Sequence, residues 1–369
     1  MGSPTTDTND PLRGSRCELN KSDFPFWTTL GNLREHWYPL AFTHSLKRNR
    51  VHRQVALGIP IVIWRTDDGN CKAFVDICPH RQAQLSLGKA NSQGLTCPYH
   101  GWRFDANGRC NHIPIAPPDR MPRETVSLTS IPLVEHAGIF WGWMGQGKPA
   151  AQPKFFELDG SGWRFTRATH LFPFDLDDVI ENFMDFAHTA VVHPGLIRGI
   201  SNPKARSVTI EVTESSVKGI HDPVDEKVGM LSGWVVPDGD VHHSDTFIIP
   251  GNIKVNYGFG SDEPSFVAFL GMTPVQENQT LILLTIGTKL GWLNPFISAS
   301  LPWLIRKVLS QDAEILAQQR ANLDLVSNRN SKSLASDSID SIVRAMRAHY
   351  QDPSRPRPKP GSHQMLVQI

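Results

Sequence analysis

The sequence contains 369 residues, of which 40% are hydrophobic and 20% are charged, and its formal net charge is +1. This length and composition are typical of a folded protein with one large domain or two ordinary ones. The balanced charge removes any general electrostatic argument for nucleic acid or an anionic membrane as a partner.

The sequence predicts no membrane span, because no run reaches the roughly 20 apolar residues that a spanning helix needs. The closest candidate, residues 290–305, carries no charge but is interrupted by Asn294, Pro295 and Pro302. We expect this stretch to begin a buried helix. An apolar entrance for a substrate is the alternative.

The cysteine count indicates the redox environment. An odd number of cysteines without a secretory signal segment argues against a disulfide framework. We therefore expect a reducing, cytoplasmic location in which thiolates are available to bind a metal. The five cysteines are Cys17, Cys71, Cys78, Cys97 and Cys110.

The first part of the chain predicts a small all-β domain. Residues 1–25 are polar and are expected to be mobile. After them, an Asp-Gly pair at 68–69 and an Asn-Gly pair at 107–108 each lie between short apolar runs, a pattern typical of β-hairpins. Residues 26–150 therefore predict short strands joined by tight turns.

The second part predicts a different domain. A stretch rich in Pro, Gly and Gln at 144–154 marks a boundary near residue 150. Beyond it, β-like runs and helices are both present, so residues 151–350 predict an α+β domain with an antiparallel sheet and packed helices. Residues 351–369 are Pro-rich and are expected to be disordered. The helices are expected at 176–192, 302–325 and 338–350.

Two Cys/His pairs, Cys78 with His80 and Cys97 with His100, indicate a metal site. Thiolate and imidazole both bind zinc and iron. Zinc fingers usually pair Cys with Cys and His with His, whereas each pair here supplies one of each. This arrangement suits a two-iron cluster in which one iron takes two thiolates and the other takes two imidazoles, which is the Rieske ligand set. A structural zinc site is the alternative.

The motifs CPHR, LSLG and LTCPYHGWRFD around these pairs resemble the Rieske domain of ring-hydroxylating and related non-haem iron oxygenases. The resemblance implies an all-β domain with a [2Fe-2S] cluster, followed by a helix-grip-like catalytic domain. The implied cluster ligands are Cys78, His80, Cys97 and His100. The cysteines outside the motif are expected to be ordinary small buried residues: Cys17, Cys71 and Cys110.

A second metal motif lies in the first predicted helix. A step of three places Asp185 and His188 near one helix face. His188 and His193 are five residues apart, about 140° around a regular helix, so they can share a metal only if the helix distorts or ends between them. Pro194 and Gly195 form a stop signal of that kind. We therefore expect His193 to lie at or just past the helix end.

Two histidines and one carboxylate with open positions form the facial triad of non-haem Fe(II) oxygenases. From the residues alone, the downstream segment offers Asp312, Glu314 and Asp324 as the carboxylate. In the resembling family, an N-x2-D-x2-H-x4-H motif is followed far downstream by an aspartate early in a long helix. Asp312 matches that aspartate, and Glu314 is the fallback. The motif is matched by Asn182, Asp185, His188 and His193.

The resemblance gives Asp185 a role other than metal ligation. In the family, the equivalent acid bridges a cluster histidine of one subunit and an iron histidine of the next, which here correspond to His100 and His188. This role requires a ring of subunits, commonly a homotrimer. The alternative is a carboxylate that only orients His188.

The resemblance implies the terminal oxygenase component of a multicomponent Rieske system, with a [2Fe-2S] cluster, a mononuclear Fe(II) ion and O2 as co-substrate. Neither G-x-G-x-x-G after a strand nor a P-loop is present. Electrons from NAD(P)H would therefore come only indirectly, through a flavin-containing reductase with or without a ferredoxin. The size is similar to that of the monooxygenase and demethylase branch. The alternatives are a Rieske electron-transfer protein without oxygenase activity and a ring cis-dihydroxylating dioxygenase.

The expected substrate is an apolar or aromatic small molecule. Candidate pocket residues, which would serve equally well as core, come from the β-like runs of the second domain: Phe247, Ile249, Val255, Tyr257, Phe259, Phe266 and Phe269. The remaining histidines have no partner at ligand spacing and are expected to be surface or core residues: His112, His136, His170, His221, His242 and His243.

Overall fold

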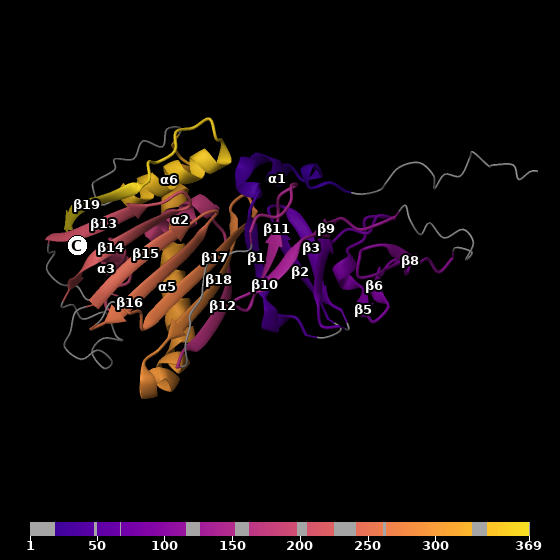
Figure 1. Cartoon of the computed structure of the whole chain (residues 1–369), viewed down its shortest axis with the longest axis horizontal. Helices are drawn as coiled ribbons and strands as arrows, with labels where there is room; N and C mark the ends of the chain where they lie inside the picture. The colour runs from indigo at the N-terminus through magenta and orange to yellow at the C-terminus, as the bar shows by residue number, and fades with distance from the viewer. Residues whose placement is uncertain are drawn as a thin grey trace, which may run out of the picture. The chain divides into compact units, whose positions relative to one another are not determined.

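The chain folds into two compact units, residues 1–29 with 35–152 and residues 30–34 with 153–369 (Figure 1). The division falls close to residue 150. The first unit is all-β and the second combines a large antiparallel sheet with helices, so the predicted α+β fold class is confirmed. The computed structural model describes residues 19–47, 50–66, 68–115, 126–151, 162–197, 205–224, 241–260, 263–326 and 338–368.

In its described residues, the first unit consists of antiparallel strands and short helical turns. The strands form three sheets, in the orders β1-β11-β10, β2-β3-β4-β9 and β5-β6-β7-β8. The helical turns are η1 Lys21–Asp23, α1 Pro25–Thr29, η3 Thr43–Ser45 and η4 Leu85–Leu87. The strands are β1 Trp37–Phe42, β2 Val51–Ala56, β3 Ile59–Arg65, β4 Cys71–Val75, β5 Lys89–Asn91, β6 Gly94–Thr96, β7 Arg103–Phe104, β8 Cys110–His112, β9 Ser130–Ile131, β10 Leu133–His136 and β11 Ile139–Trp143.

Tight turns set the strand registers of this unit. Leu57 and Gly58 have φ angles of 53° and 77° and join β2 to β3, so that Ala56 pairs with Ile59. Two successive positive φ angles are typical of a type I′ turn, whose twist matches that of the strands it joins. The predicted hairpin around Gly108 is also present, as β7 and β8.

Residues 19–25 pack on the first unit, although residues 1–25 were expected to be mobile. Lys21 is 8% exposed, and its Nζ donates hydrogen bonds to the carbonyls of Trp143 and Gly145 at 2.9 and 2.6 Å. Buried carbonyls need such donors, and this pairing holds the segment on its unit. The prediction is therefore wrong for residues 19–25, and residues 1–18 lie outside the described ones.

The second unit is built on one antiparallel sheet of eight strands, in the order β12-β18-β17-β16-β15-β14-β13-β19. Helices precede, interrupt and follow its strands along the chain: η2 Gly31–Arg34, α2 Leu176–Met184, α3 Thr189–Val192, η6 Gly291–Leu293, α5 Asn294–Leu323 and α6 Ser338–Gln351. The strands are β12 Arg164–Phe172, β13 Ala205–Val212, β14 Ser216–Val224, β15 Val241–Ile248, β16 Asn252–Phe259, β17 Phe266–Gln276, β18 Gln279–Thr288 and β19 Gly361–Gln368.

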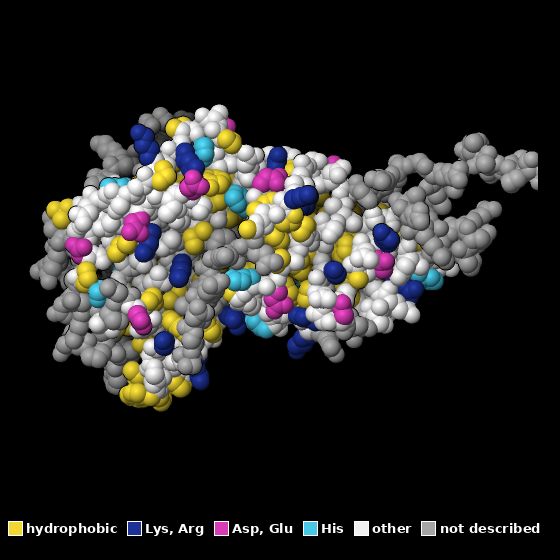
Figure 2. Space-filling view, in the orientation of Figure 1, with side chains coloured by type: hydrophobic (Ala, Val, Ile, Leu, Met, Phe, Trp, Pro, Cys, Tyr) yellow, Lys and Arg dark blue, Asp and Glu magenta, His cyan; other side chains and the backbone are white. Residues whose placement is uncertain are grey.

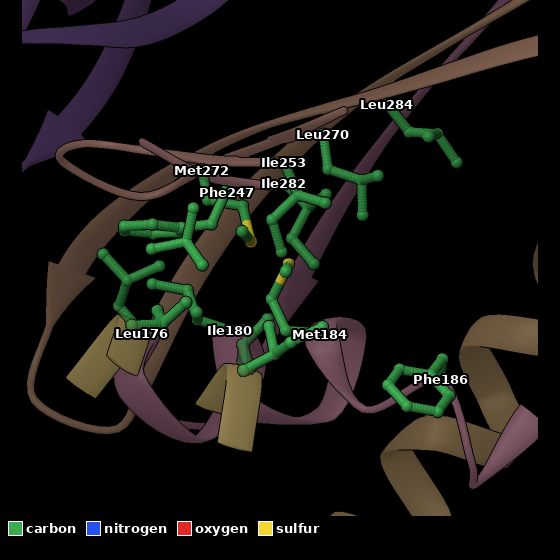
Figure 3. Packing of buried hydrophobic residues seen from close by; sticks show 14 of the residues in the cluster. Leu176, Ile180, Met184, Phe186, Phe247, Ile253, Leu270, Met272, Ile282 and Leu284 are labelled. Carbon is green, nitrogen blue, oxygen red and sulfur yellow. The ribbon is translucent and has the colours of Figure 1, made fainter. Parts of the chain in front are cut away.

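The core of this unit lies between the sheet and its helices. Helix α2 buries Leu176, Ile180 and Met184, which recur every four residues and so share one helix face. Figure 3 shows these side chains directed at apolar residues of the central strands. This packing fixes the position of the chain that follows α2, where the second metal motif lies. The strand residues labelled opposite α2 include Phe247, Ile253, Met272 and Ile282.

Helix α5 begins at Asn294 rather than at 302 as predicted. Pro295 lies in the first turn, where backbone N–H groups have no partner within the helix, so the lack of an N–H costs no helical hydrogen bond. Pro302 lies inside the helix without ending it. Buried Ile297, Leu301 and Ile305, at steps of four, carry one apolar face across the proline. Tertiary packing therefore outweighs the local signal that suggested a later start.

The C-terminal segment, which was expected to be disordered, ends in a strand. Strand β19 pairs antiparallel with β13 from Ala205 opposite Gln368 to Val212 opposite Gly361. Val367 is buried against the core of the unit. The prediction is wrong for residues 361–368. It rested on the Pro-rich composition of residues 352–360, whereas residues 361–368 pair with strand β13. None of the described helices is long and apolar enough to cross a membrane.

Candidate metal centres and substrate cavity

The two Cys/His loops have the same backbone hydrogen-bond pattern. The amide of Gln82 donates to the carbonyl of Cys78 at 2.8 Å, and that of Gly101 donates to the carbonyl of Cys97 at 3.2 Å. The amide of Cys78 donates to the carbonyl of Ala83, and the amide of Cys97 donates to the carbonyl of Trp102, both at 2.8 Å. Gln82 and Gly101 both have positive φ angles, 54° and 71°. Matched turns therefore present the two cysteines in equivalent positions.

The four predicted cluster ligands lie close together within this unit. Cys78 and Cys97 are buried, and the rings of His80 and His100 have centroids 4.5 Å apart. Burial raises the pKa of the Cys78 thiol to about 12, and the neighbouring Cys97 side chain adds to the effect. A metal cation offsets this cost by binding the thiolate. His80 Nδ1 is buried without a hydrogen-bond partner among the described residues, which also fits a metal ligand.

The two cluster histidines have different surroundings. The Trp102 ring stacks on His80, with centroids 4.5 Å apart and planes within 5°. His100 instead contacts Tyr99, which is 62% exposed. Trp102 therefore covers one face of the His80 ring, whereas the aromatic neighbour of His100 is exposed to solvent.

Asp76 supports the first loop and was not predicted from the sequence. Its buried carboxylate accepts hydrogen bonds from the amide and hydroxyl of Ser86, at 2.7 and 2.6 Å. Arg53 Nε lies 3.3 Å away. These contacts tie the chain before Cys78 to η4. The only sequence signal was an acid at the end of a buried strand, two residues before the cysteine.

The predicted helix over 176–192 is broken at Asp185, which has a ψ angle of 98°. Its carboxylate accepts hydrogen bonds from the amides of Ala187 and His188, at 2.8 and 3.4 Å. A side chain that bonds to nearby amides in this way competes with the helical pattern. The short helix α3 follows, and His193 is its C-cap, so His193 lies at a helix end as expected.

His188, His193 and Asp312 meet at one place. Nε2 of His193 lies 3.0 Å from Oδ1 of Asp312, and Nε2 of His188 lies 3.5 Å from the same oxygen. One ligand atom from each residue lies within 4.8 Å of the other two. Helix α5 supplies Asp312, which is 1% exposed. The competing acids Glu314 and Asp324 are exposed on the same segment and are not in this group.

Both imidazoles of this triad are oriented through their second nitrogen. Nδ1 of His193 lies 3.0 Å from the side-chain oxygen of Gln311. Nδ1 of His188 pairs with the backbone carbonyl of Asp185. Since a carbonyl oxygen only accepts, each Nδ1 carries a proton, so a bound metal would meet Nε2 of the neutral imidazole. Gln311 directly precedes Asp312, and its contact with His193 was not predicted from the sequence.

The carboxylate of Asp312 is suited to bind a cation. Burial opposes its ionisation, but hydrogen bonds with His188, His193 and Asn182 lower its pKa to about 2. Asn182 Nδ2 donates to Oδ1 at 3.0 Å. Oδ2 is buried and has no partner among the described residues. A metal ion would supply that missing partner.

Asp185 contributes to the triad through its backbone rather than its side chain. Its carboxylate is 3.9 Å from Nδ1 of His188 and is 37% exposed. The backbone carbonyl of Asp185 therefore orients His188, a role that the alternative prediction gave to its carboxylate.

A cavity of about 210 Å³ adjoins the triad and includes all three of its residues in the wall. The rest of the described wall is mostly apolar and comes from strands β15–β18, helix α5 and the segment from Phe183 to Ile197. Alternation along β16 brings its lining residues to one face. Four predicted pocket residues line the cavity: Val255, Tyr257, Phe259 and Phe266. The other three are buried outside its wall: Phe247, Ile249 and Phe269.

The apolar stretch 290–305 has two faces. One face lines the cavity with Ile297, Leu301 and Ile305. The other is open to solvent: Figure 2 shows hydrophobic side chains gathered at the start of α5, where Trp292 is 78% and Phe296 is 70% exposed. The stretch is thus both a buried helix start and a wall of the cavity.

The prediction that His221 and His243 lack a partner at ligand spacing is wrong. Both histidines contact Asp245 on the second unit's sheet. His221 lies on β14, whereas His243 and Asp245 lie on β15, so their proximity depends on strand register and has no signature in the linear sequence.

Known proteins share both units. The Rieske [2Fe-2S] domain family matches residues 36–132, and the vanillate O-demethylase oxygenase C-terminal domain family matches residues 175–351. Flavonoid 8-hydroxylase 2 of Ocimum basilicum is 35% identical over 181 residues, which are 44% of this chain and 34% of that protein. Protein TIC 55 of Pisum sativum is 30% identical over 298 residues, which are 77% of this chain and 51% of that protein.

The crystal structure of dicamba monooxygenase bound to dicamba has a TM-score of 0.73 at 20% identity, covering 87% of this chain and 98% of the other. At that identity the likeness shows the fold. The chain spans about half or less of the length of the first curated relatives it matches.

The protein is thus a Rieske protein whose cluster domain precedes an oxygenase-type C-terminal domain. The chain thus carries a Rieske [2Fe-2S] domain and a vanillate O-demethylase oxygenase C-terminal domain, in that order.

Proposed function

We propose that the chain is the terminal oxygenase of a multicomponent Rieske system, a monooxygenase or demethylase that oxidises an apolar or aromatic small molecule with O2. The observation that carries the proposal is the position of His188, His193 and Asp312 in the wall of a largely apolar cavity. A cluster domain alone would only transfer electrons. A second metal triad beside a cavity gives a substrate a place to react.

Two metal groups are implied. Cys78, His80, Cys97 and His100 would hold a [2Fe-2S] cluster. An Fe(II) ion would be held by His188, His193 and Asp312. His80 Nδ1 and Asp312 Oδ2 have no hydrogen-bond partner in the described part of the chain, which supports these ligand sets. When bound, the cluster supplies single electrons and the iron supplies O2 activation.

The chain's own residues would position the substrate and exclude water. Tyr257 and Phe266 on the sheet and Leu301 on α5 would hold an apolar body against the triad. The low pKa of Asp312 keeps this ligand an anion at neutral pH. Asn182 would hold the same carboxylate in place.

Electrons would come from a flavin-containing reductase, with or without a ferredoxin. We further propose a homotrimer in which Asp185 of one subunit joins His188 to His100 of the next. The exposed carboxylate of Asp185 and the half-buried ring of His100 support this arrangement, since both remain open to another subunit. A cytoplasmic location is supported by the thiols of Cys71 and Cys110, which form no disulfide among the described residues.

Iron counting and product analysis test the proposed function. The purified protein should contain about three Fe per chain, two in the cluster and one in the triad. It is supplied with a reductase, O2 and a panel of aromatic, methoxy- and N-methyl compounds. Gain of one oxygen atom, gain of two, or loss of a methyl group separates monooxygenation, dioxygenation and demethylation.

Asp312→Ala should lose one Fe per chain and all product while the absorbance of the cluster remains. Glu314→Ala, exposed on the same helix, is the matched control and should retain both. Product formation by the Asp312 variant would contradict the proposal. About two Fe per chain in the unmodified protein would favour an electron-transfer protein instead.

A further inference from the structure

The first three turns of helix α5 are apolar on both of their sides. The inward side forms part of the cavity wall. On the outward side, Phe296 and Trp303 lie seven residues apart, which is about two turns, so they share one helix face. A helix that is apolar all round is normally buried. The exposure of this outward side therefore indicates a surface that binds something.

The outward side and the turn before it form one continuous patch. Figure 2 shows hydrophobic side chains gathered at this end of α5. Single exposed apolar residues are common, whereas a contiguous exposed patch marks a site of interaction. Steps of three and four residues connect the exposed members of this patch, which we call the α5 patch: Trp292, Pro295, Phe296, Ala299, Pro302 and Trp303.

Cations flank the α5 patch at both ends. Lys289 precedes it, and Arg306 and Lys307 follow it on the next turn of the helix. All three side chains are exposed, and none forms an ion pair with a residue that the structure describes. The Arg306 Nε donates a hydrogen bond to the carbonyl of Pro302 at 3.1 Å, which holds this side chain along the patch.

The sequence around the patch contains no compensating acid. Between Glu277 and Asp312 there is neither Asp nor Glu. The formal net charge of +1 for the whole chain therefore hides a local excess of positive charge. A basic border around exposed aromatic side chains complements a surface that is apolar inside and anionic at its boundary.

We propose that the α5 patch docks the protein on an anionic lipid surface. Trp and Phe side chains insert at the level of the lipid headgroups, and Lys and Arg beside them attract anionic headgroups. Interfaces with another protein are also rich in aromatic residues, but they are depleted of Lys. Two of the three flanking cations are Lys289 and Lys307, which favours lipid. The docking does not depend on the proposed oxygenase function.

Co-sedimentation of the full chain with lipid vesicles tests the proposal. One set of vesicles is phosphatidylcholine alone, and the other also contains about 30% phosphatidylglycerol to supply the negative charge. We expect the protein to sediment with the anionic vesicles. Binding should be at least about tenfold weaker on neutral vesicles, and salt should weaken binding to the anionic ones because it screens the attraction. Protein without vesicles measures any sedimentation of its own.

Substitutions in the patch test the apolar contribution. Trp292→Ser, Phe296→Ser and Trp303→Ser together should lower the affinity for anionic vesicles at least about tenfold. Leu325→Ser is the matched control, because Leu325 is 83% exposed just beyond the other end of α5. It should bind as the unmodified protein does. The substituted side chains are exposed, so the cluster absorbance and the melting temperature should stay unchanged in both proteins.

Substitutions of the cations test the electrostatic contribution. Lys289→Gln, Arg306→Gln and Lys307→Gln should each weaken binding to anionic vesicles about fivefold. Binding to neutral vesicles should not change, because it does not involve charge.

Three outcomes would overturn the proposal. The first is no sedimentation with anionic vesicles beyond that of the protein alone. The second is full binding by the variant with three serines, which would place the lipid contact elsewhere. The third is a lower native mass of that variant in lipid-free buffer, which would show that a second copy of the chain covers the patch.

Discussion

Replacing Gln311 by leucine removes one hydrogen bond just outside the iron triad. The side-chain oxygen of Gln311 lies 3.0 Å from Nδ1 of His193 and accepts its N–H. Leucine has a similar size but no acceptor, so the buried imidazole would lose its partner, at a cost of about 1–3 kcal/mol. Loss of such a partner typically lowers metal affinity about 10–100-fold, which corresponds to about 1.4–2.7 kcal/mol. The two estimates overlap, and we expect the Kd for Fe(II) to rise by that factor.

The assay is competition for Fe(II) with a chelator of known affinity, with the cluster followed separately by its absorbance. Gln318→Leu is the matched control, because Gln318 is an exposed glutamine of the same helix. Its Kd should not change. If Gln311→Leu binds Fe(II) within about twofold of this control, the effect expected of a ligand-orienting partner is missing. The orientation of His193 would then not depend on Gln311.

Three other changes test separate parts of the molecule. Asp185→Asn should keep both metal groups but stop electron transfer from cluster to iron, and normal turnover would remove the bridge assignment. Leu301→Trp should fill the cavity of about 210 Å³ and abolish substrate binding without loss of iron; binding at the original affinity would mean that the substrate lies elsewhere. Lys21→Met leaves the carbonyls of Trp143 and Gly145 without a donor, so the first unit should lose about 1–3 kcal/mol of stability in denaturant titrations. An unchanged midpoint would show that the segment before Trp27 is not held by Lys21.

The features predicted from sequence are those with local causes. The hairpin turns follow from residues that favour positive φ, and the metal loops follow from ligand types at short spacing. Strand β19 depends on a sheet edge that is distant in sequence, so the Pro-rich composition wrongly predicted disorder there. The start of α5 depends on core packing, so Pro302 wrongly predicted a later start. The break at Asp185 depends on one side chain capping its own neighbours.

The candidate site shows the same division. His188 and His193 lie in one short motif, whereas three acids were equally good partners until the family resemblance favoured Asp312. Gln311 is one of several glutamines in its helix, and only the fold shows which one meets His193. The group around Asp245 depends on the register of β14 and β15 and has no linear signature.

Strand β19 also affects how an assembly of this chain can be measured. It forms the outer edge of the eight-stranded sheet beside β13. A protein shortened before Gly361 would leave the N–H and C=O groups of β13 without their strand partners. Unpaired edges of this kind recruit strands from other copies. Native-mass measurements of such a shortened protein would therefore report edge-to-edge association, so a subunit ring can be counted only with β19 in place.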